Sequence, residues 1–96
     1  MKYSYAAVSD VGKREINEDA LEVRAGRCYL ACALGDGLGG QGSGDFASKL
    51  ATDVSIRRMS GFLPIGRRTL DACVREANRL IRDQQEEQHC RMMTTL

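Results

Sequence analysis

The sequence predicts a small α+β domain in which antiparallel strands come first and two helices follow. Three observations support this fold class. The apolar run Cys28–Leu34 is too short for a typical helix and ends at a glycine, as a strand would. Six glycines lie within residues 35–44, where the backbone must turn tightly, and two stretches with helical spacing of apolar residues follow. The 96 residues have room for one domain.

Three strands are expected, over residues 3–9, 20–24 and 28–34. The first combines aromatic, small and β-branched side chains and ends in a turn-forming cluster, Ser9–Gly12. Residues 24–27 have the character of a hairpin turn between the second strand and the third. Because the third strand is apolar throughout, we expect both of its faces to be buried, with Cys28 and Cys32 packed in the core.

Two helices are expected, over residues 44–59 and 69–87, separated by residues 61–66 with their Pro64. Ser43 and Asp45 are residue types that can cap the N-terminus of the first of these helices. The first helix has its apolar residues at helical spacing: Phe46, Ala47, Leu50, Ala51 and Val54. The second has one apolar stripe opposite a charged face, and we expect the whole stripe to be core: Leu70, Cys73, Val74, Ala77, Leu80 and Ile81.

Charge and hydropathy exclude several classes of protein. With 14 basic and 13 acidic side chains, the net charge of +1 gives no general attraction to nucleic acid. The arginines beside the interhelical break are expected to form a solvated rim: Arg57, Arg58, Arg67 and Arg68. No apolar run has the length of a membrane span, and the first residues lack the apolar core of a signal peptide. We therefore expect a cytoplasmic protein without a membrane partner.

The four cysteines have neither metal-site nor disulfide spacing, so free thiols are expected. A zinc site that uses His89 and Cys90 is disfavoured, because adjacent residues rarely supply two ligands. His89 is expected to be a solvated side chain in a polar stretch.

The glycine-rich loop matches a dinucleotide fingerprint as Gly35-x-Gly37-x-x-Gly40, with Asp53 near the place of a ribose-binding acid. Hairpin-like strands precede this loop, whereas a dinucleotide fold needs a parallel βαβ unit. The loop also lacks the Gly-Lys-Ser/Thr of a phosphate-binding P-loop. We therefore keep nucleotide binding only as a weak alternative.

A hard divalent cation is a better match to an aspartate at the end of a buried strand. The Asp36 carboxylate and the Gly37 carbonyl would supply two oxygen ligands. In an antiparallel hairpin the start of one strand lies beside the end of its neighbour, so Glu18 can share this end of the sheet. Arg14 beside such a site could grip a phosphate. The alternative that Arg14 and the Glu18–Asp19 pair are only solvated loop residues stays open.

Three segments together resemble the metal-dependent protein phosphatase family of the protein phosphatase 2C type, particularly its bacterial members. The first carries Arg-x-x-Asn-Glu-Asp and the second carries Asp-Gly-x-Gly-Gly. The segments are Ser9–Ala20, Gly35–Ser48 and Met92–Leu96. The resemblance implies a four-layer αββα sandwich with two manganese or magnesium ions at one end, of which this chain would be the N-terminal part.

The resemblance also implies a hydrolase mechanism, in which a metal-activated water cleaves phosphoserine or phosphothreonine. Asp36 would bridge the two metals, and the Gly37 carbonyl and Glu18 would be further ligands. Asp19 would hold metal-bound water, and Arg14 would bind the substrate phosphate. The partner implied is a phosphoprotein, modified by an opposing serine/threonine kinase.

This sequence departs from the family pattern at four places: Leu38, Gln41, Asp45 and Met93. The spacing from Gly12 to Arg14 is also one residue shorter than usual. The family domain is more than twice as long, and its second half contains two further aspartate ligands. The expectation is therefore a phosphatase fragment. We expect the isolated chain to be inactive, and either self-associating or only partly folded. The alternative function is a non-catalytic remnant or binding module.

Overall fold

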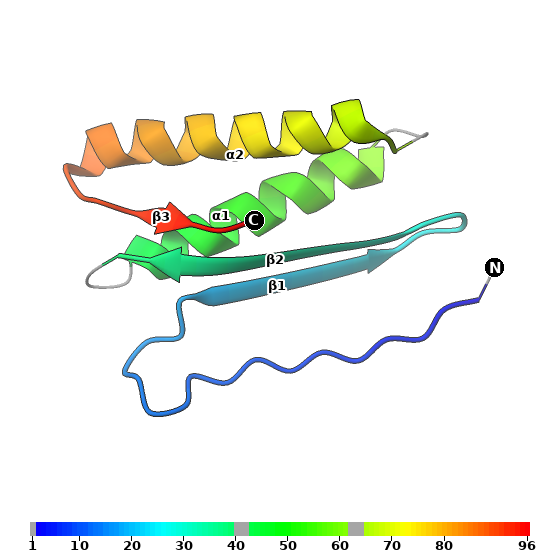
Figure 1. Ribbon diagram of the computed structural model, residues 1–96, viewed down its shortest axis with the longest axis horizontal. Coiled ribbons are helices and arrows are strands. Elements are labelled where there is room, and N and C mark those ends of the chain that lie inside the picture. Colours follow the sequence, from blue (N-terminus) through cyan, green and yellow to red (C-terminus); the bar gives the residue numbers. More distant parts are fainter. Residues whose placement is uncertain (1, 40–42, 62–64) are drawn as a thin grey trace.

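The computed structural model describes residues 2–39, 43–61 and 65–96. Two strands come first, two helices follow, and a short strand is last (Figure 1): β1 (Asp19–Ala25), β2 (Leu30–Leu38), α1 (Ser43–Gly61), α2 (Arg67–Gln88) and β3 (Met93–Thr94). The sheet has the order β1-β2-β3, with both pairs antiparallel. The α+β class is thereby confirmed. Gln41 and Pro64, together with Gly40, lie outside the described residues.

The β1–β2 hairpin runs in register from the pair Asp19 and Asp36 to the pair Ala25 and Leu30. Burial alternates strictly along β2. The face toward α1 consists of alanines and glycines, whereas the other face is exposed and carries Cys32, Leu34, Asp36 and Leu38.

The expectation that both faces of the third predicted strand are buried is therefore wrong, as is the core placement of Cys28 and Cys32, which are exposed. The reason is that helices cover one face only. Among the described residues no second layer covers the other face.

Helix α1 lies on the sheet and buries many small side chains, along with Val54, Ile56 and Met59. Its buried positions include Ala47, Ala51, Ser48, Thr52 and Ser55. The buried hydroxyls bond within the helix, since Thr52 donates to the Ser48 carbonyl (3.0 Å) and Ser55 to the Ala51 carbonyl (2.8 Å). Small residues on both sides let the helix backbone approach the strands closely. The predicted range 44–59 lies within α1, although Phe46 is on its exposed side.

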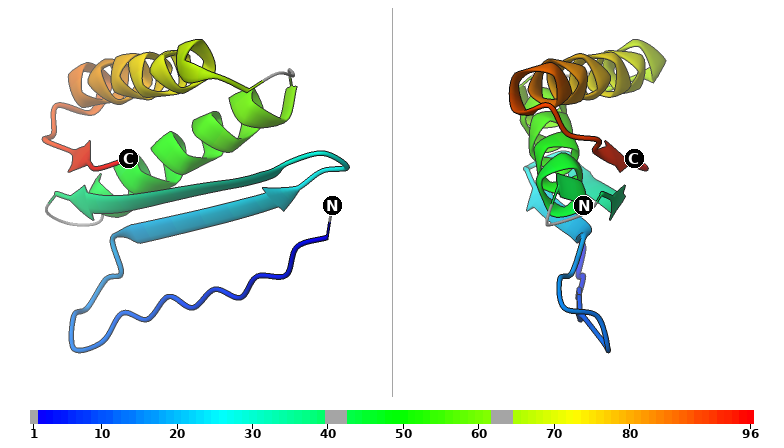
Figure 2. Two further views of the ribbon diagram at one scale, coloured as in Figure 1. Left: turned by 45° about the vertical axis from the view of Figure 1, so that its right-hand side comes forward. Right: turned by 90° about the vertical axis from the view of Figure 1, so that its left-hand side faces the viewer.

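Helix α2 packs against α1, as the side view in Figure 2 shows. Only Cys73, Ala77 and Ile81 of its predicted stripe are buried, whereas Leu70 and Val74 are about half exposed. The expectation that the whole stripe is core was too broad. Helix α2 packs against α1, and a single helix covers a narrower strip of its surface than a sheet would. The predicted range 69–87 lies within α2, and His89 is exposed after its end.

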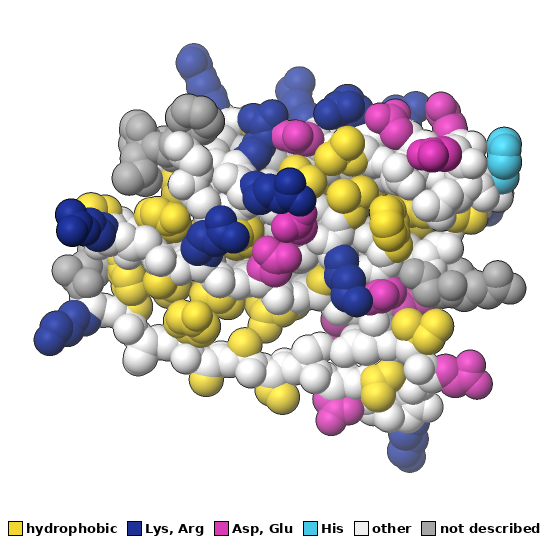
Figure 3. Space-filling model, turned by 180° about the vertical axis from the view of Figure 1, so that it is seen from behind, with side chains coloured by type: hydrophobic (Ala, Val, Ile, Leu, Met, Phe, Trp, Pro, Cys, Tyr) yellow, Lys and Arg dark blue, Asp and Glu magenta, His cyan; other side chains and the backbone are white. Residues whose placement is uncertain are grey.

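The N-terminal residues 2–10 are extended but form no strand, so the strand expected over 3–9 is not found. The segment runs beside β1 in the opposite direction without a ladder (Figure 1). Val8 is 90% exposed, and Tyr5 is 58% exposed. A hollow of about 810 Å³ separates this segment from β1 and α1. Figure 3 shows hydrophobic side chains between the helical layer and this segment. A β-prone sequence alone does not make a strand, because each strand needs a partner for its backbone groups.

The C-terminal residues return to the end of β2. Gly37 is paired with Thr94, and Leu38 with Met93. The Thr95 amide donates to the Asp36 carbonyl (3.0 Å), while the Thr95 hydroxyl accepts from the Asp36 amide (2.9 Å). Both backbone groups of Asp36 are therefore held by the last residues of the chain. In the part of the chain that the structure describes, no helix combines the length and the apolar character needed to cross a membrane.

We expect the thiols to differ in reactivity. Cys73 is 3% exposed, and burial raises the pKa of its thiol, so little nucleophilic thiolate forms near neutral pH. Cys28 and Cys32 are exposed. In dilute protein, maleimide should therefore label Cys28 and Cys32 much faster than Cys73, as peptide mass spectrometry after timed quenching would show. Urea should remove the difference. Equal labelling rates in the native protein would contradict the buried position of Cys73.

Candidate functional site

The five residues that the sequence singled out lie around one hollow at the acidic end of the sheet. This hollow has a volume of about 420 Å³, and its lining includes Arg14, Glu18, Asp19, Asp36 and Gly37. Asp19 and Asp36 are directly opposite in the β1–β2 ladder. Directly opposite residues point to the same face of a sheet, so both carboxyl groups belong to the open face.

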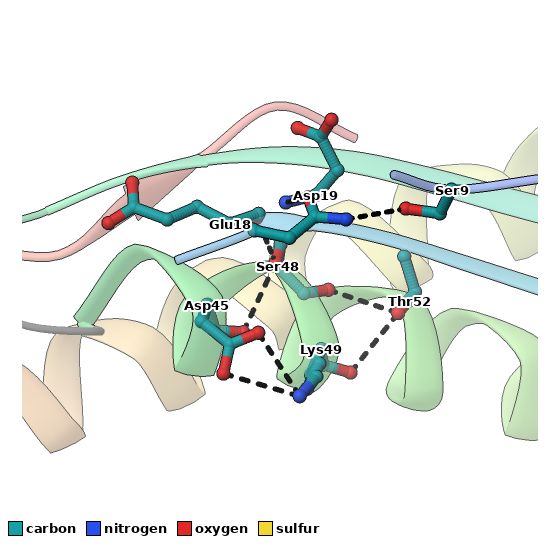
Figure 4. A network of polar contacts seen from close by, with 8 residues as sticks. Ser9, Glu18, Asp19, Asp45, Ser48, Lys49 and Thr52 are labelled. Carbon is teal, nitrogen blue, oxygen red and sulfur yellow. Dashed lines mark hydrogen bonds and ion pairs between the residues drawn. The ribbon is translucent and has the colours of Figure 1, made fainter. Parts of the chain in front are cut away.

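Glu18 shares this end of the sheet with Asp36 but not the same face. The Gly37 amide donates to the Glu18 carbonyl (3.0 Å), which makes these two residues the next pair along the hairpin. The Glu18 carboxylate lies beside the first turn of α1, where its Oε2 would be 2.5 Å from a Cβ on Gly44. Figure 4 shows the carboxyl groups of Glu18 and Asp19 pointing in different directions. Antiparallel pairing therefore predicted the correct end of the sheet for Glu18, but it did not predict on which face of the sheet the side chain lies.

Three residues without a predicted role hold this acidic end in place. Asn17 accepts a hydrogen bond from the Asp19 amide (3.0 Å) and donates one to Ser9 (2.7 Å). Ser48 of α1 donates to the Glu18 carbonyl (2.6 Å), as Figure 4 shows. An asparagine two residues before a strand is a common turn-forming signal, so the role of Asn17 could have been found from the sequence. The role of Ser48 could not have been found in this way, because its contact with Glu18 joins distant parts of the chain.

Arg14 comes from the loop between the N-terminal segment and β1. This loop turns at Gly12, whose φ of +63° favours glycine, and the Gly12 amide bonds to the Asp10 carboxylate (2.7 Å). The Arg14 amide then donates to the Val11 carbonyl (3.3 Å). The loop thus places Arg14, an exposed residue, in the lining of the same hollow as Asp19 and Asp36.

The oxygen-rich lining fits the donor preference of magnesium and manganese. The two opposed carboxylates repel one another, and a cation between them would offset that repulsion. Among residues 2–39, 43–61 and 65–96, however, no three His, Cys, Asp or Glu side chains come together as a metal site. The ligands present are thus of the right kind, and further ones are needed to complete a coordination shell.

The nucleotide-binding alternative gains nothing from this geometry. The strand before the glycine loop belongs to an antiparallel hairpin, and Asp53 forms an ion pair with Arg57 on α1. Gly37 has a packing role instead, because a Cβ there would overlap the Gly44 carbonyl oxygen.

Comparisons with protein-family models, with curated proteins and with solved structures found no match.

Proposed function

We propose that this chain is the N-terminal part of a metal-dependent protein serine/threonine phosphatase. The observation that carries the proposal is the common hollow, whose lining includes Asp36 of β2 together with Asp19, Glu18 and Arg14 from the start of β1 and the loop before it. The motif resemblance assigns these same residues to metal and phosphate binding. Divalent ions at such a site would lower the pKa of a water molecule and neutralise charge on the phosphoryl oxygens.

The residues of the chain would divide the work by chemistry. Asp36 and the Gly37 carbonyl would hold the ions from the end of β2. Glu18, which directly precedes β1, would add a further carboxylate. Asp19, opposite Asp36, would orient a water molecule by accepting a hydrogen bond. The planar guanidinium of Arg14 would bind two oxygens of the phosphate group and orient it toward the carboxylates.

The proposed substrate is a phosphoprotein in the cytoplasm, phosphorylated by a serine/threonine kinase. A second candidate function, a non-catalytic binding module of the same fold, is favoured by the incomplete set of acidic ligands among the described residues. The sequence that follows Leu96 in the gene separates the two. Two further aspartates in the family context would favour catalysis, and a stop codon would favour the binding module.

Manganese binding tests the site directly, because the paramagnetic ion broadens nearby amide signals even when it binds weakly. In ¹⁵N-labelled protein, we expect substoichiometric Mn²⁺ to broaden the signals of Asp19, Asp36 and Gly37 first. The acidic pair Glu86 and Glu87 at the end of α2 is an internal control for non-specific binding. Earlier or equal broadening at that pair would reject the proposed metal site.

The 96-residue chain alone should have no measurable phosphatase activity. Affinity for hard cations follows the number of charged oxygens, and the acidic side chains among the described residues do not make up a metal site. The measurement is p-nitrophenyl phosphate hydrolysis with excess Mn²⁺, compared with buffer and with the Asp36→Asn variant. Manganese-dependent turnover that this variant loses would contradict the prediction of inactivity and would show that the chain suffices for catalysis.

A further inference from the structure

The loop that carries Arg14 also exposes two apolar side chains. Val11 is 39% exposed and Ile16 is 42% exposed, and both line the hollow at the acidic end of the sheet. They are the only apolar side chains within residues 9–19, where every other side chain is polar or charged. Apolar residues scattered singly over a surface are ordinary, whereas two on the wall of one hollow indicate a contact surface for a ligand.

The backbone of this loop is held at several points. Asn17 accepts a hydrogen bond from the Asp19 amide (3.0 Å), and the Arg14 amide donates to the Val11 carbonyl (3.3 Å). The loop lies at the same end of the molecule as the end of β2 (Figure 1). Val11 and Ile16 flank Arg14 in the sequence, and both are β-branched, so a contact with them restricts few side-chain rotamers.

The charges in the hollow favour an anionic ligand beside these apolar residues. Lys13 and Arg14 both line it, and neither belongs to an ion pair among the described residues. The volume of about 420 Å³ lies within the roughly 300–1,000 Å³ that ligand sites occupy, which leaves room for a phosphorylated residue and a neighbouring side chain. Inorganic phosphate would use the cations alone and would leave Val11 and Ile16 exposed.

We propose that Val11 and Ile16 select phosphorylated segments in which an apolar residue stands directly beside the phosphorylated serine or threonine. This inference rests on the proposed function and specifies its substrate class. Arg14 binds the phosphate, and the apolar neighbours of the phosphorylated residue pack on Val11 and Ile16. The contact removes apolar surface of both partners from water, so a polar neighbour at the same place gains less.

Titrations of the ¹⁵N-labelled chain in excess Mg²⁺, followed by amide chemical shifts, test this preference. A peptide with leucine on both sides of phosphoserine should bind about five- to tenfold more tightly than the same peptide with glutamine in both places. The double variant Val11→Ser, Ile16→Ser should remove most of that difference. Val74→Ser is the matched control, because Val74 is 55% exposed on α2 and does not line this hollow.

Free phosphoserine separates this inference from the proposed function. If phosphoserine shifts the Arg14 and Asp36 signals and the two peptides bind equally, the preference is overturned and the phosphate site remains. If phosphoserine shifts neither signal, the phosphate site is rejected, and the preference with it. A leucine peptide that binds as tightly without its phosphate would also overturn the inference, as would a preference that Val74→Ser removes as fully as the double variant does.

Discussion

Replacing Asp36 with Asn is expected to abolish manganese-dependent phosphoprotein hydrolysis in a longer chain that also supplies the remaining acidic ligands. Asp36 is the proposed ligand shared by both ions, and its backbone is held at the end of β2 by hydrogen bonds to the amide and the hydroxyl of Thr95. Asparagine keeps the shape and removes the charge. Because even outer-shell changes at metal sites cost about ten- to a hundredfold, loss of a bridging carboxylate should lower the rate by at least about a hundredfold.

Initial rates on a phosphopeptide, measured over a range of Mn²⁺ concentrations, check this expectation. Asp83→Asn is a matched control, because Asp83 is an exposed carboxylate paired with Arg79 on α2, away from the hollow. Arg14→Ala should instead mainly raise KM, in agreement with a role in phosphate binding. An Asp36→Asn rate within about threefold of the unmodified enzyme would rule out Asp36 as a bridging ligand, given the cost of losing one.

Gly37→Ala should destabilise the fold by at least about 3 kcal/mol or prevent folding altogether. A Cβ at this position would overlap the Gly44 carbonyl, and it would be 2.7 Å from the Glu18 carbonyl oxygen. Both obstacles are backbone atoms, so no side-chain rotation relieves the overlap. The strand and the first turn of α1 would have to separate, which opens the acidic end of the sheet.

Urea unfolding followed by circular dichroism measures this effect, and Gly61→Ala is the matched control. A Cβ at Gly61, the last residue of α1, meets nothing within 4 Å. Its substitution should be neutral or slightly stabilising, because alanine restricts the unfolded chain. If Gly37→Ala unfolded at the same urea concentration as the unmodified chain, the close packing of β2 on α1 would be wrong.

Local patterns in the sequence were enough to predict the hairpin and both helices, but the strand expected over 28–34 continues to Leu38, through residues expected in the glycine loop. Periodicity identifies such elements because it depends on residues that are neighbours in the chain. Burial was harder to predict, since Cys32 and Leu34 are apolar whether or not a second layer covers them. The strand expected over residues 3–9 failed for a similar reason: its pairing depends on distant residues, and none of the described residues provides a ladder.

The same holds for the candidate site: features that depend on neighbouring residues could be predicted, and features that depend on distant residues could not. The antiparallel hairpin correctly placed Glu18 and Asp36 at one end of the sheet. It could not assign them to faces, because a shift of one residue in register moves every side chain to the opposite face. The register that pairs Asp19 with Asp36 depends on the hairpin turn and on contacts with α1. The roles of Ser48 and Thr95 depend on such contacts too.

The small side chains between α1 and the sheet have a thermodynamic consequence. The heat capacity increment of unfolding grows with newly hydrated apolar surface and shrinks with newly hydrated polar surface. Alanine exposes little apolar surface on unfolding, and the buried Ser48, Thr52 and Ser55 expose hydroxyl groups. Because Ile56 and Met59 are also buried in this contact, the increment per residue should lie toward the low end of the usual range of about 12–15 cal/mol/K. Such a protein has a flat stability curve and loses little stability on cooling, where leucine-rich cores begin to weaken.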